Sequence, residues 1–304
     1  MNEITVGIIA LVVLLALFFT GLELPFCMIL VGFSGFAYLV DFTAASHMVA
    51  SDVYEVFASY AYTVFPLFIF MGQIAFVSGI AGKLYDSAYK FFGHIPGGLA
   101  IATVGGATAF KSLCGSAVAT AATFSNLAIP QMNRYGYSRT LGTGLVAIVG
   151  TLGCLMPPTI FLIIYGLITE QSIGALFLAG IFPGLGIAVL WIVTIFIWAK
   201  FNPGLAPAGG KSTWKERFAS LPEVAVVLGV FLLMIVGLLK GFFTPTEAGG
   251  IGVAAVLVMV IVGRQLSFKS YVTAMGEGLR TASMLLMLIA GSAVLGHFIT
   301  VTNR

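Results

Sequence analysis

The chain has 304 residues, of which 60% are hydrophobic and only 8% are charged. Soluble domains carry about 25% charged residues, so this composition excludes a water-soluble globular protein and also a disordered chain. The formal net charge of +3 is too small and too dispersed for a protein that binds nucleic acid. The sequence therefore predicts an all-α polytopic protein that crosses the lipid bilayer several times.

The cysteines and the short motifs exclude further classes of protein. Cys27, Cys114 and Cys154 lie in apolar segments without a C-x-x-C pair, so neither a disulfide framework nor a zinc site is expected. The first residues lack a basic segment and a cleavage site, which favours a retained first span over a signal peptide. No metalloprotease, P-loop or dinucleotide-binding motif and no catalytic triad is visible, so the chain is not expected to be an enzyme.

Candidate spans follow from the distribution of charge, because a helix needs about 20 apolar residues to cross the hydrocarbon core. Most of the charge-free runs are long enough once a turn of flanking residues is added. These runs are 4–22, 24–40, 56–82, 91–110, 112–133, 140–169, 171–199, 224–239, 248–263 and 281–303.

The charges between the spans predict which loops face the cytoplasm, where Lys and Arg accumulate. The loop 41–55 has only acidic charges and is expected outside, whereas the mainly basic loop 264–280 is expected inside. Segments 81–93 and 212–222 are predicted as amphipathic helices at the membrane surface. Thr244 or Thr246, before Glu247, is expected to cap the helix that opens the run 248–263.

The order of spans is repeated with opposite starting sides, which is typical of inverted-repeat transporters. Three spans precede a Gly-rich segment, and the spans at 221–240, 248–263 and 281–302 repeat that order. We therefore predict four parts: scaffold helices in 1–55, part of a transport domain in 56–169, a connecting span with a basic loop in 170–220, and the opening of a second repeat in 221–304.

The stretch 97–132 differs from its neighbours, because its middle, Lys111–Ser116, is polar and small. It is consistent with a re-entrant helical hairpin, and equally with two ordinary spans joined by a short loop. Irregular backbone at membrane depth is tolerated where it is buried or lines a wet cavity. For Lys111, extension of the side chain to the cytoplasmic interface is slightly preferred over pairing with an anionic substrate.

A second interruption lies inside the charge-free run 140–169. Pro157 and Pro158 each remove a backbone donor and clash with the preceding turn, and Gly150 and Gly153 loosen the same point. The run therefore predicts two half-helices with free carbonyl and amide groups between them. Such ends coordinate Na⁺ or attract anions in transporters, although a proline kink with a purely structural role is the simpler alternative.

The two interruptions supply the candidate sodium and substrate site, since hydroxyl and carbonyl oxygens suit a hard cation. Tight helix packing is the alternative role for the small residues, and packing or hairpin hydrogen bonding is the alternative role for Asn126. The candidates are Ser112, Gly115, Ser116, Thr120, Asn126, Gly150, Thr151, Gly153, Pro157 and Thr159. Within this group, Na⁺ is assigned to Ser116, Gly150, Gly153 and Thr159.

Three segments together resemble landmarks of one transporter family. These are Gly115–Ala117 followed by Ile129–Tyr137, then Gly153–Thr159, and then Thr244–Ala248. In order and spacing, over essentially the whole chain, they resemble the DctM-like large membrane subunit of tripartite ATP-independent periplasmic (TRAP) transporters. Lys111 and Cys114 depart from the family pattern, and Thr159 stands where Ser is common.

The resemblance implies an inner-membrane importer of organic acids, coupled to Na⁺ and working by an elevator movement, with no other cofactor. C4-dicarboxylates, sialic acids and sugar acids are the implied substrates. The implied partners are a small four-helix, DctQ-like membrane subunit and a DctP-like periplasmic binding protein. The family has a second hairpin after the equivalent of 281–302, so the chain is expected to be truncated at its C-terminus. The alternative function is another ion-coupled carrier or a passive channel.

Overall fold

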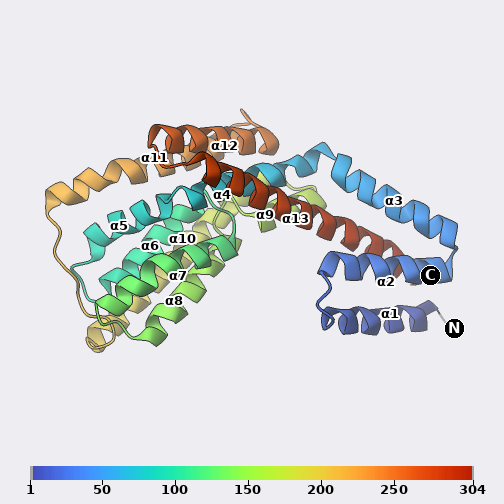
Figure 1. Ribbon diagram of the computed structural model, residues 1–304, viewed down its shortest axis with the longest axis horizontal. Coiled ribbons are helices and arrows are strands. Elements are labelled where there is room, and N and C mark those ends of the chain that lie inside the picture. The colour runs from blue at the N-terminus through green and yellow to red at the C-terminus, as the bar shows by residue number, and fades with distance from the viewer. Residues whose placement is uncertain (1–2, 303–304) are drawn as a thin grey trace. The chain divides into compact units, whose positions relative to one another are not determined.

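The computed structural model describes residues 3–302, and every regular element in that range is helical (Figure 1). The elements are α1 (Glu3–Phe18), α2 (Leu24–Leu39), α3 (Phe42–Ala58), η1 (Tyr60–Thr63), α4 (Val64–Val77), α5 (Ile80–Phe92), α6 (Gly98–Lys111), α7 (Ala117–Arg134), α8 (Arg139–Thr151), η2 (Leu152–Cys154), α9 (Ile160–Ile168), α10 (Ile173–Phe201), α11 (Trp214–Leu239), α12 (Pro245–Val262) and α13 (Phe268–Thr302).

Several helices are long and apolar enough to cross a membrane. Within the described residues there are five such segments: Tyr60–Val77, Ile173–Phe201, Trp214–Leu239, Pro245–Val262 and Phe268–Thr302. Shorter apolar helices are also present at Glu3–Phe18, Leu24–Leu39 and Arg139–Cys154. The all-helical architecture and these segments make the chain a multi-pass helical membrane protein, as the composition predicts.

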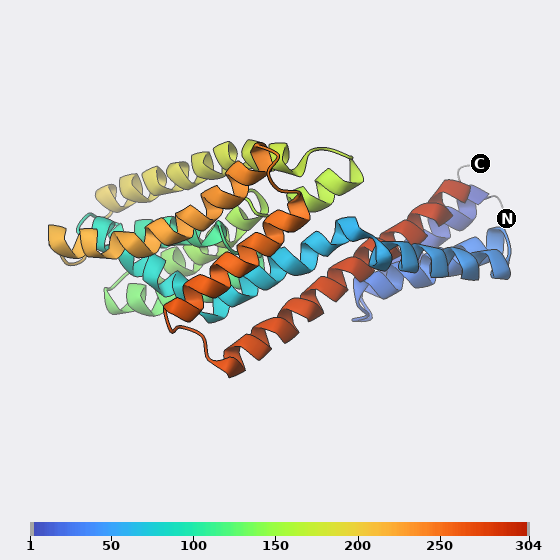
Figure 2. The same cartoon turned by 90° about the horizontal axis from the view of Figure 1, so that it is seen from above.

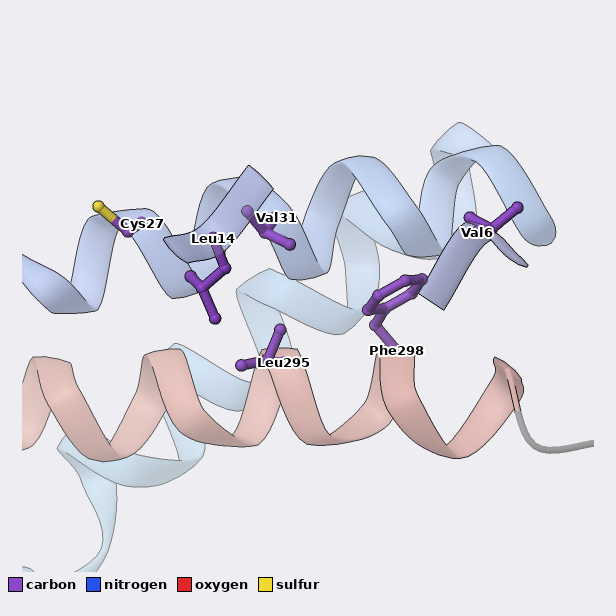
Figure 3. Close-up of a cluster of buried hydrophobic side chains, with 6 residues drawn as sticks. All are labelled: Val6, Leu14, Cys27, Val31, Leu295 and Phe298. Carbon is purple, nitrogen blue, oxygen red and sulfur yellow. The ribbon is translucent and has the colours of Figure 1, made fainter. Parts of the chain in front are cut away.

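The contacts divide the chain into two compact units, residues 1–63 with 279–304 and residues 64–278. In the first unit, α1, α2 and α3 surround the C-terminal part of α13. A buried apolar cluster joins them, and Figure 3 shows Leu295 and Phe298 of α13 directed toward the side chains from α1 and α2. The cluster consists of Val6, Leu14, Cys27, Val31, Leu295 and Phe298.

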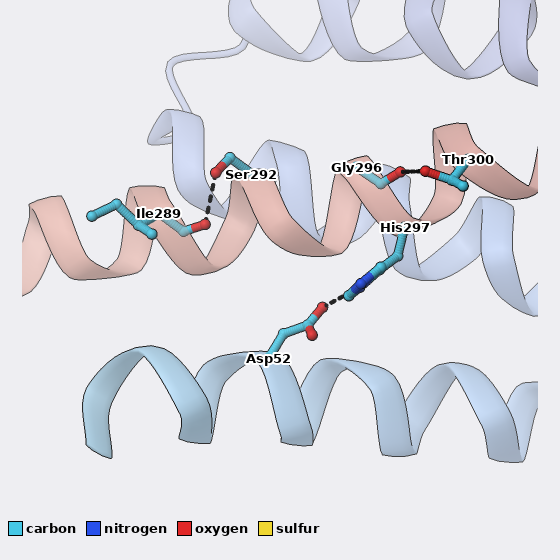
Figure 4. Close-up of polar contacts among 6 residues, drawn as sticks. All are labelled: Asp52, Ile289, Ser292, Gly296, His297 and Thr300. Atoms are coloured by element: carbon cyan, nitrogen blue, oxygen red, sulfur yellow. Dashed lines mark hydrogen bonds and ion pairs between the residues drawn. The ribbon is translucent and has the colours of Figure 1, made fainter. Parts of the chain in front are cut away.

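Helices α2 and α13 approach closely because α2 has glycines on the shared face. A Cβ atom at Gly32 would lie 2.9 Å from Cγ1 of Val294 and 3.0 Å from the backbone nitrogen of Leu295. Small residues of this kind let membrane helices pack backbone against backbone. On the other side of α13, His297 Nδ1 lies 2.9 Å from Oδ2 of the nearly buried Asp52 on α3 (Figure 4).

In the second unit, α6 packs against α5, α7, α8 and α10, while α12 packs against α4 and α11 (Figures 1 and 2). The loop after α10 holds the open ends of the α6–α7 pair. The amide of Gly97 donates to the carbonyl of Ala206 at 3.0 Å, and that of Ser138 donates to Leu205 at 3.0 Å. The base of the α6–α7 pair is therefore fixed by backbone hydrogen bonds.

Three expectations about the segments between spans were wrong. Most of the acidic loop 41–55 belongs to α3, because Asp41 caps that helix and no Gly or Pro interrupts it; its Oδ2 accepts from the amide of Ala44 at 2.9 Å. Most of the loop 264–280 is the first part of α13. Segment 212–222 is not a separate helix, since α11 continues through Pro222. The expected cap at Thr244 is confirmed, with Glu247 completing a capping box.

The close approach of α2 and α13 gives a testable prediction. We expect Gly32→Ala to lower the apparent melting temperature of the detergent-solubilised protein by several degrees, because overpacking costs about 1–3 kcal/mol. Gly296→Ala is the matched control, since a Cβ atom at this position of α13 meets no atom within 4 Å. Thermal unfolding followed by intrinsic fluorescence makes the comparison, and equal melting temperatures for the two variants would contradict the packing argument.

Candidate functional site

The stretch 97–132 folds as two antiparallel helices joined by a break at 112–116. Helix α6 has 14 residues and is therefore about 21 Å long, against a hydrocarbon core of about 30 Å. A helix of that length does not cross a membrane alone. Helix α7 has 18 residues and is about 27 Å long, so the stretch forms a helical hairpin whose first helix is the shorter one.

The run 140–169 is a broken helix, as predicted. Helix α8 ends at Thr151, the short η2 turn follows, and α9 begins at Ile160. The 13 residues of α8 and the 9 residues of α9 correspond to about 20 Å and about 14 Å. Each half is shorter than the hydrocarbon core is thick.

The two breaks pack directly against each other. A Cβ atom at Gly115 would lie 2.5 Å from the carbonyl oxygen of Pro158 and 3.4 Å from Cα of Thr159. At Gly150 it would lie 3.4 Å from the carbonyl oxygen of Ala117. We call this contact region, residues 111–117 and 150–159, the junction. Glycine is needed at position 115 because backbone meets backbone there, whereas the nearest atom to a Cβ at position 150 is Cβ of Ala121 at 3.2 Å.

Lys111 lies inside the junction, and the expectation that it extends to the cytoplasmic interface was wrong. Its side chain is fully buried, and Nζ donates a hydrogen bond to the carbonyl oxygen of Ser116 at 2.6 Å. Lys111 is the last residue of α6, where the negative end of the helix dipole favours a cation. A Cβ atom at residue 153 would overlap Nζ, so Gly153 leaves the space that the ammonium group occupies.

The hydroxyl groups at the junction differ in whether they have partners. Ser112 donates to Ala109 at 2.6 Å and Thr120 donates to the carbonyl of Ser116 at 3.0 Å, so both serve their own helices. Ser116 caps α7 by accepting from the amide of Ala119 at 3.2 Å. Thr159 is fully buried, and its Oγ1 has no hydrogen-bond partner among the described residues.

Burying a hydroxyl group without a hydrogen-bond partner costs folding free energy. Thr159 is therefore the strongest ligand candidate. It precedes α9 as its N-cap residue, yet its side chain makes no capping hydrogen bond. Its oxygen therefore remains available to a ligand. The sequence pointed to this residue only through its position after the two prolines.

Two candidates from the sequence do not face the junction. Thr151 is exposed, and its hydroxyl donates to the carbonyl of Ile148 at 2.7 Å within α8. Asn126 is exposed on α7, more than two turns beyond the tip. Pro157 is buried and lies toward Gly180 of α10, where a Cβ atom would stand 3.7 Å from its Cδ.

The charges and helix ends around the junction decide what it can bind. No Asp or Glu occurs between Asp86 and Glu170, so neither the hairpin nor the broken helix contains a carboxylate. The N-termini of α7 and α9 and the C-termini of α6 and α8 all end at the junction. Helix N-termini favour anions and C-termini favour cations, so the junction suits a small cation and a carboxylate together.

Sequence comparison places this chain among transport proteins. Residues 11–304 match the family described as tripartite ATP-independent periplasmic transporter, DctM component. The chain is 34% identical over 271 residues to the C4-dicarboxylate TRAP transporter large permease protein DctM of Pseudomonas aeruginosa, covering 88% of this chain and 63% of that protein.

Two further relatives are named for different compounds. The ectoine/5-hydroxyectoine TRAP transporter large permease protein UehC of Ruegeria pomeroyi is 36% identical, over 75% of this chain and 53% of its own length. The sialic acid TRAP transporter large permease protein SiaM of Vibrio cholerae is 29% identical, over 94% of this chain and 66% of its own length. The chain thus spans between half and two thirds of these relatives. The expectation of a transport component instead of an enzyme is confirmed, and the chain belongs to the DctM family of TRAP transporter components.

Proposed function

We propose that this chain is the permease subunit of a Na⁺-coupled importer of organic acids, with the junction as part of its binding site. The observation that carries the proposal is the buried hydroxyl of Thr159, unpartnered among the described residues, beside the hairpin tip at Gly115. Membership of the DctM family supports it. C4-dicarboxylates, sialic acid and ectoine, for which relatives are named, all carry a carboxylate.

For the cation we propose oxygen ligands from Ser116, Gly150, Gly153 and Thr159. The fit is partial. The oxygens are neutral, and that of Thr159 lacks a partner among the described residues, as a hard cation requires. However, the Lys111 ammonium lies against Ser116 and Gly153. Bound Na⁺ would supply positive charge for a substrate carboxylate, while the N-termini of α7 and α9 orient that carboxylate.

The remaining parts of the proposal concern the assembly. We propose that the chain works in the bacterial inner membrane with a small DctQ-like membrane subunit and a DctP-like periplasmic binding protein. We also propose an elevator movement of the part that carries the junction. The description of the family as one component of a tripartite periplasmic transporter supports the partners, and the grouping of contacts into two units supports the movement.

Uptake into proteoliposomes tests the function. The permease is reconstituted with the membrane subunit and the binding protein encoded beside it, and radiolabelled succinate and sialic acid are supplied as probes. We expect uptake of at least one probe only when an inward Na⁺ gradient and the binding protein are both present. Uptake that continues after removal of either would favour another carrier or a passive channel.

Thr159→Val tests the cation site, because valine keeps the shape of threonine and removes only the hydroxyl. If the hydroxyl binds Na⁺, the Na⁺ concentration for half-maximal uptake should rise about tenfold, as expected for a loss of about 1.4 kcal/mol. Thr151→Val is the matched control. It should leave the Na⁺ concentration for half-maximal uptake unchanged, since the Thr151 hydroxyl donates within its own helix. An unchanged Na⁺ dependence in Thr159→Val would remove Thr159 from the site.

A further inference from the structure

The buried side chain of Lys111 has no role in the proposed function, and it carries a positive charge into the place assigned to a cation. Its Nζ lies 2.6 Å from the carbonyl oxygen of Ser116 and fills the space left by Gly153. Ser116 and Gly153 are two of the four proposed Na⁺ ligands. The same carbonyl also accepts from the amide of Thr120 at 3.2 Å and from its hydroxyl at 3.0 Å, so the ammonium is its third donor. Backbone carbonyls at such breaks coordinate Na⁺ in transporters.

The surroundings of Lys111 hold no carboxylate that neutralises its charge. The nearest acidic residues along the chain, Asp86 and Glu170, flank the hairpin and the broken helix and do not belong to them. The titratable groups that face the ammonium are the thiols of Cys114 and Cys154. What stabilises the charge is therefore the Ser116 carbonyl and the C-terminal end of α6.

We propose that the Lys111 ammonium is a tethered cation that competes with Na⁺ for the Ser116–Gly153 side of the junction. This inference rests on the proposed function, because it concerns the same cation site. Lys111 lowers the affinity for Na⁺ by charge repulsion and by occupying one carbonyl oxygen. Na⁺ then binds the junction weakly, through Thr159 and the remaining oxygens, while Lys111 stays hydrogen-bonded to the hairpin tip at Ser116.

Equilibrium binding of ²²Na⁺ to the purified, detergent-solubilised protein tests this inference without any transport step. Lys111→Met removes the charge and keeps the length of the side chain. We expect it to bind Na⁺ at least tenfold more tightly than the unaltered protein. Lys83→Met is the matched control: Lys83 is a half-exposed lysine on α5, paired with Glu223 at 2.9 Å, and its removal should leave Na⁺ binding unchanged.

Lys111→Gln separates charge from hydrogen bonding and also serves if the methionine variant fails to fold. Its amide can still donate to the Ser116 carbonyl, yet it is neutral, so Na⁺ should again bind at least tenfold more tightly. Equal or weaker Na⁺ binding in a folded Lys111 variant overturns the inference while leaving the cation site intact. Absence of Na⁺ binding in every protein overturns both the inference and the proposed site.

A substrate-binding measurement tests the other role that a buried lysine could have, which is pairing with the substrate carboxylate. Binding of radiolabelled succinate is measured at an Na⁺ concentration that saturates both proteins. We expect no difference between the unaltered protein and Lys111→Met. Loss of succinate binding in the variant, with unchanged Na⁺ affinity, would make Lys111 the partner of the substrate carboxylate and overturn its role as a tethered cation.

Discussion

A helix that opens inside a membrane leaves peptide groups without water, and this constraint governs the arrangement of the second unit. The hairpin tip and the broken helix each expose such groups, and neither could stand alone in hydrocarbon. They are placed against each other, with Gly115 on the Pro158 carbonyl and Gly150 beside the Ala117 carbonyl. The hairpin tip and the break in the helix thus shield each other's peptide groups.

The same unit shows how a re-entrant hairpin is held in position. Its base is connected to the loop after α10 by the amides of Gly97 and Ser138, and Tyr137 Oη accepts from the amide of Leu99 at 3.2 Å. Its tip is held by the Lys111–Ser116 hydrogen bond and by the contact with the broken helix. Both ends of the hairpin are therefore fixed by contacts within the second unit.

Sequence patterns predicted the features that depend on local chemistry. The prolines at 157 and 158 marked the break, and Thr244 with Glu247 marked the start of α12. They did not predict α3, whose acidic residues resembled a loop, because the Asp41 cap and the packing of α3 decide its conformation. The sequence also did not predict that the side chain of Lys111 is buried at the junction. The conformation of a long side chain depends on its tertiary contacts, and the space beside Gly153 exists only in the folded chain.

Among the candidate ligands, the sequence assigned Na⁺ to Thr159 and kept Thr151 only in the wider group, and the structure shows a physical difference between the two. Both are threonines beside the break, yet one returns its hydroxyl to its own helix and the other is buried without a protein partner among the described residues. A helical threonine can always bond to the preceding turn, whereas a threonine in extended backbone before a helix cannot. Where the helix breaks therefore decides which of the two hydroxyls is left without a protein partner among the described residues.

The overlap between Nζ of Lys111 and a Cβ atom at residue 153 makes these two positions share one volume. A larger residue at 153 is compatible only with a shorter one at 111, so substitutions at the two positions are interdependent. Replacing Gly153 alone would displace the amine, whereas after Lys111 has been shortened the same Cβ atom would still meet Cα of Ala117 at 3.1 Å. The missing side chain at 153 thus determines which residues position 111 can accept.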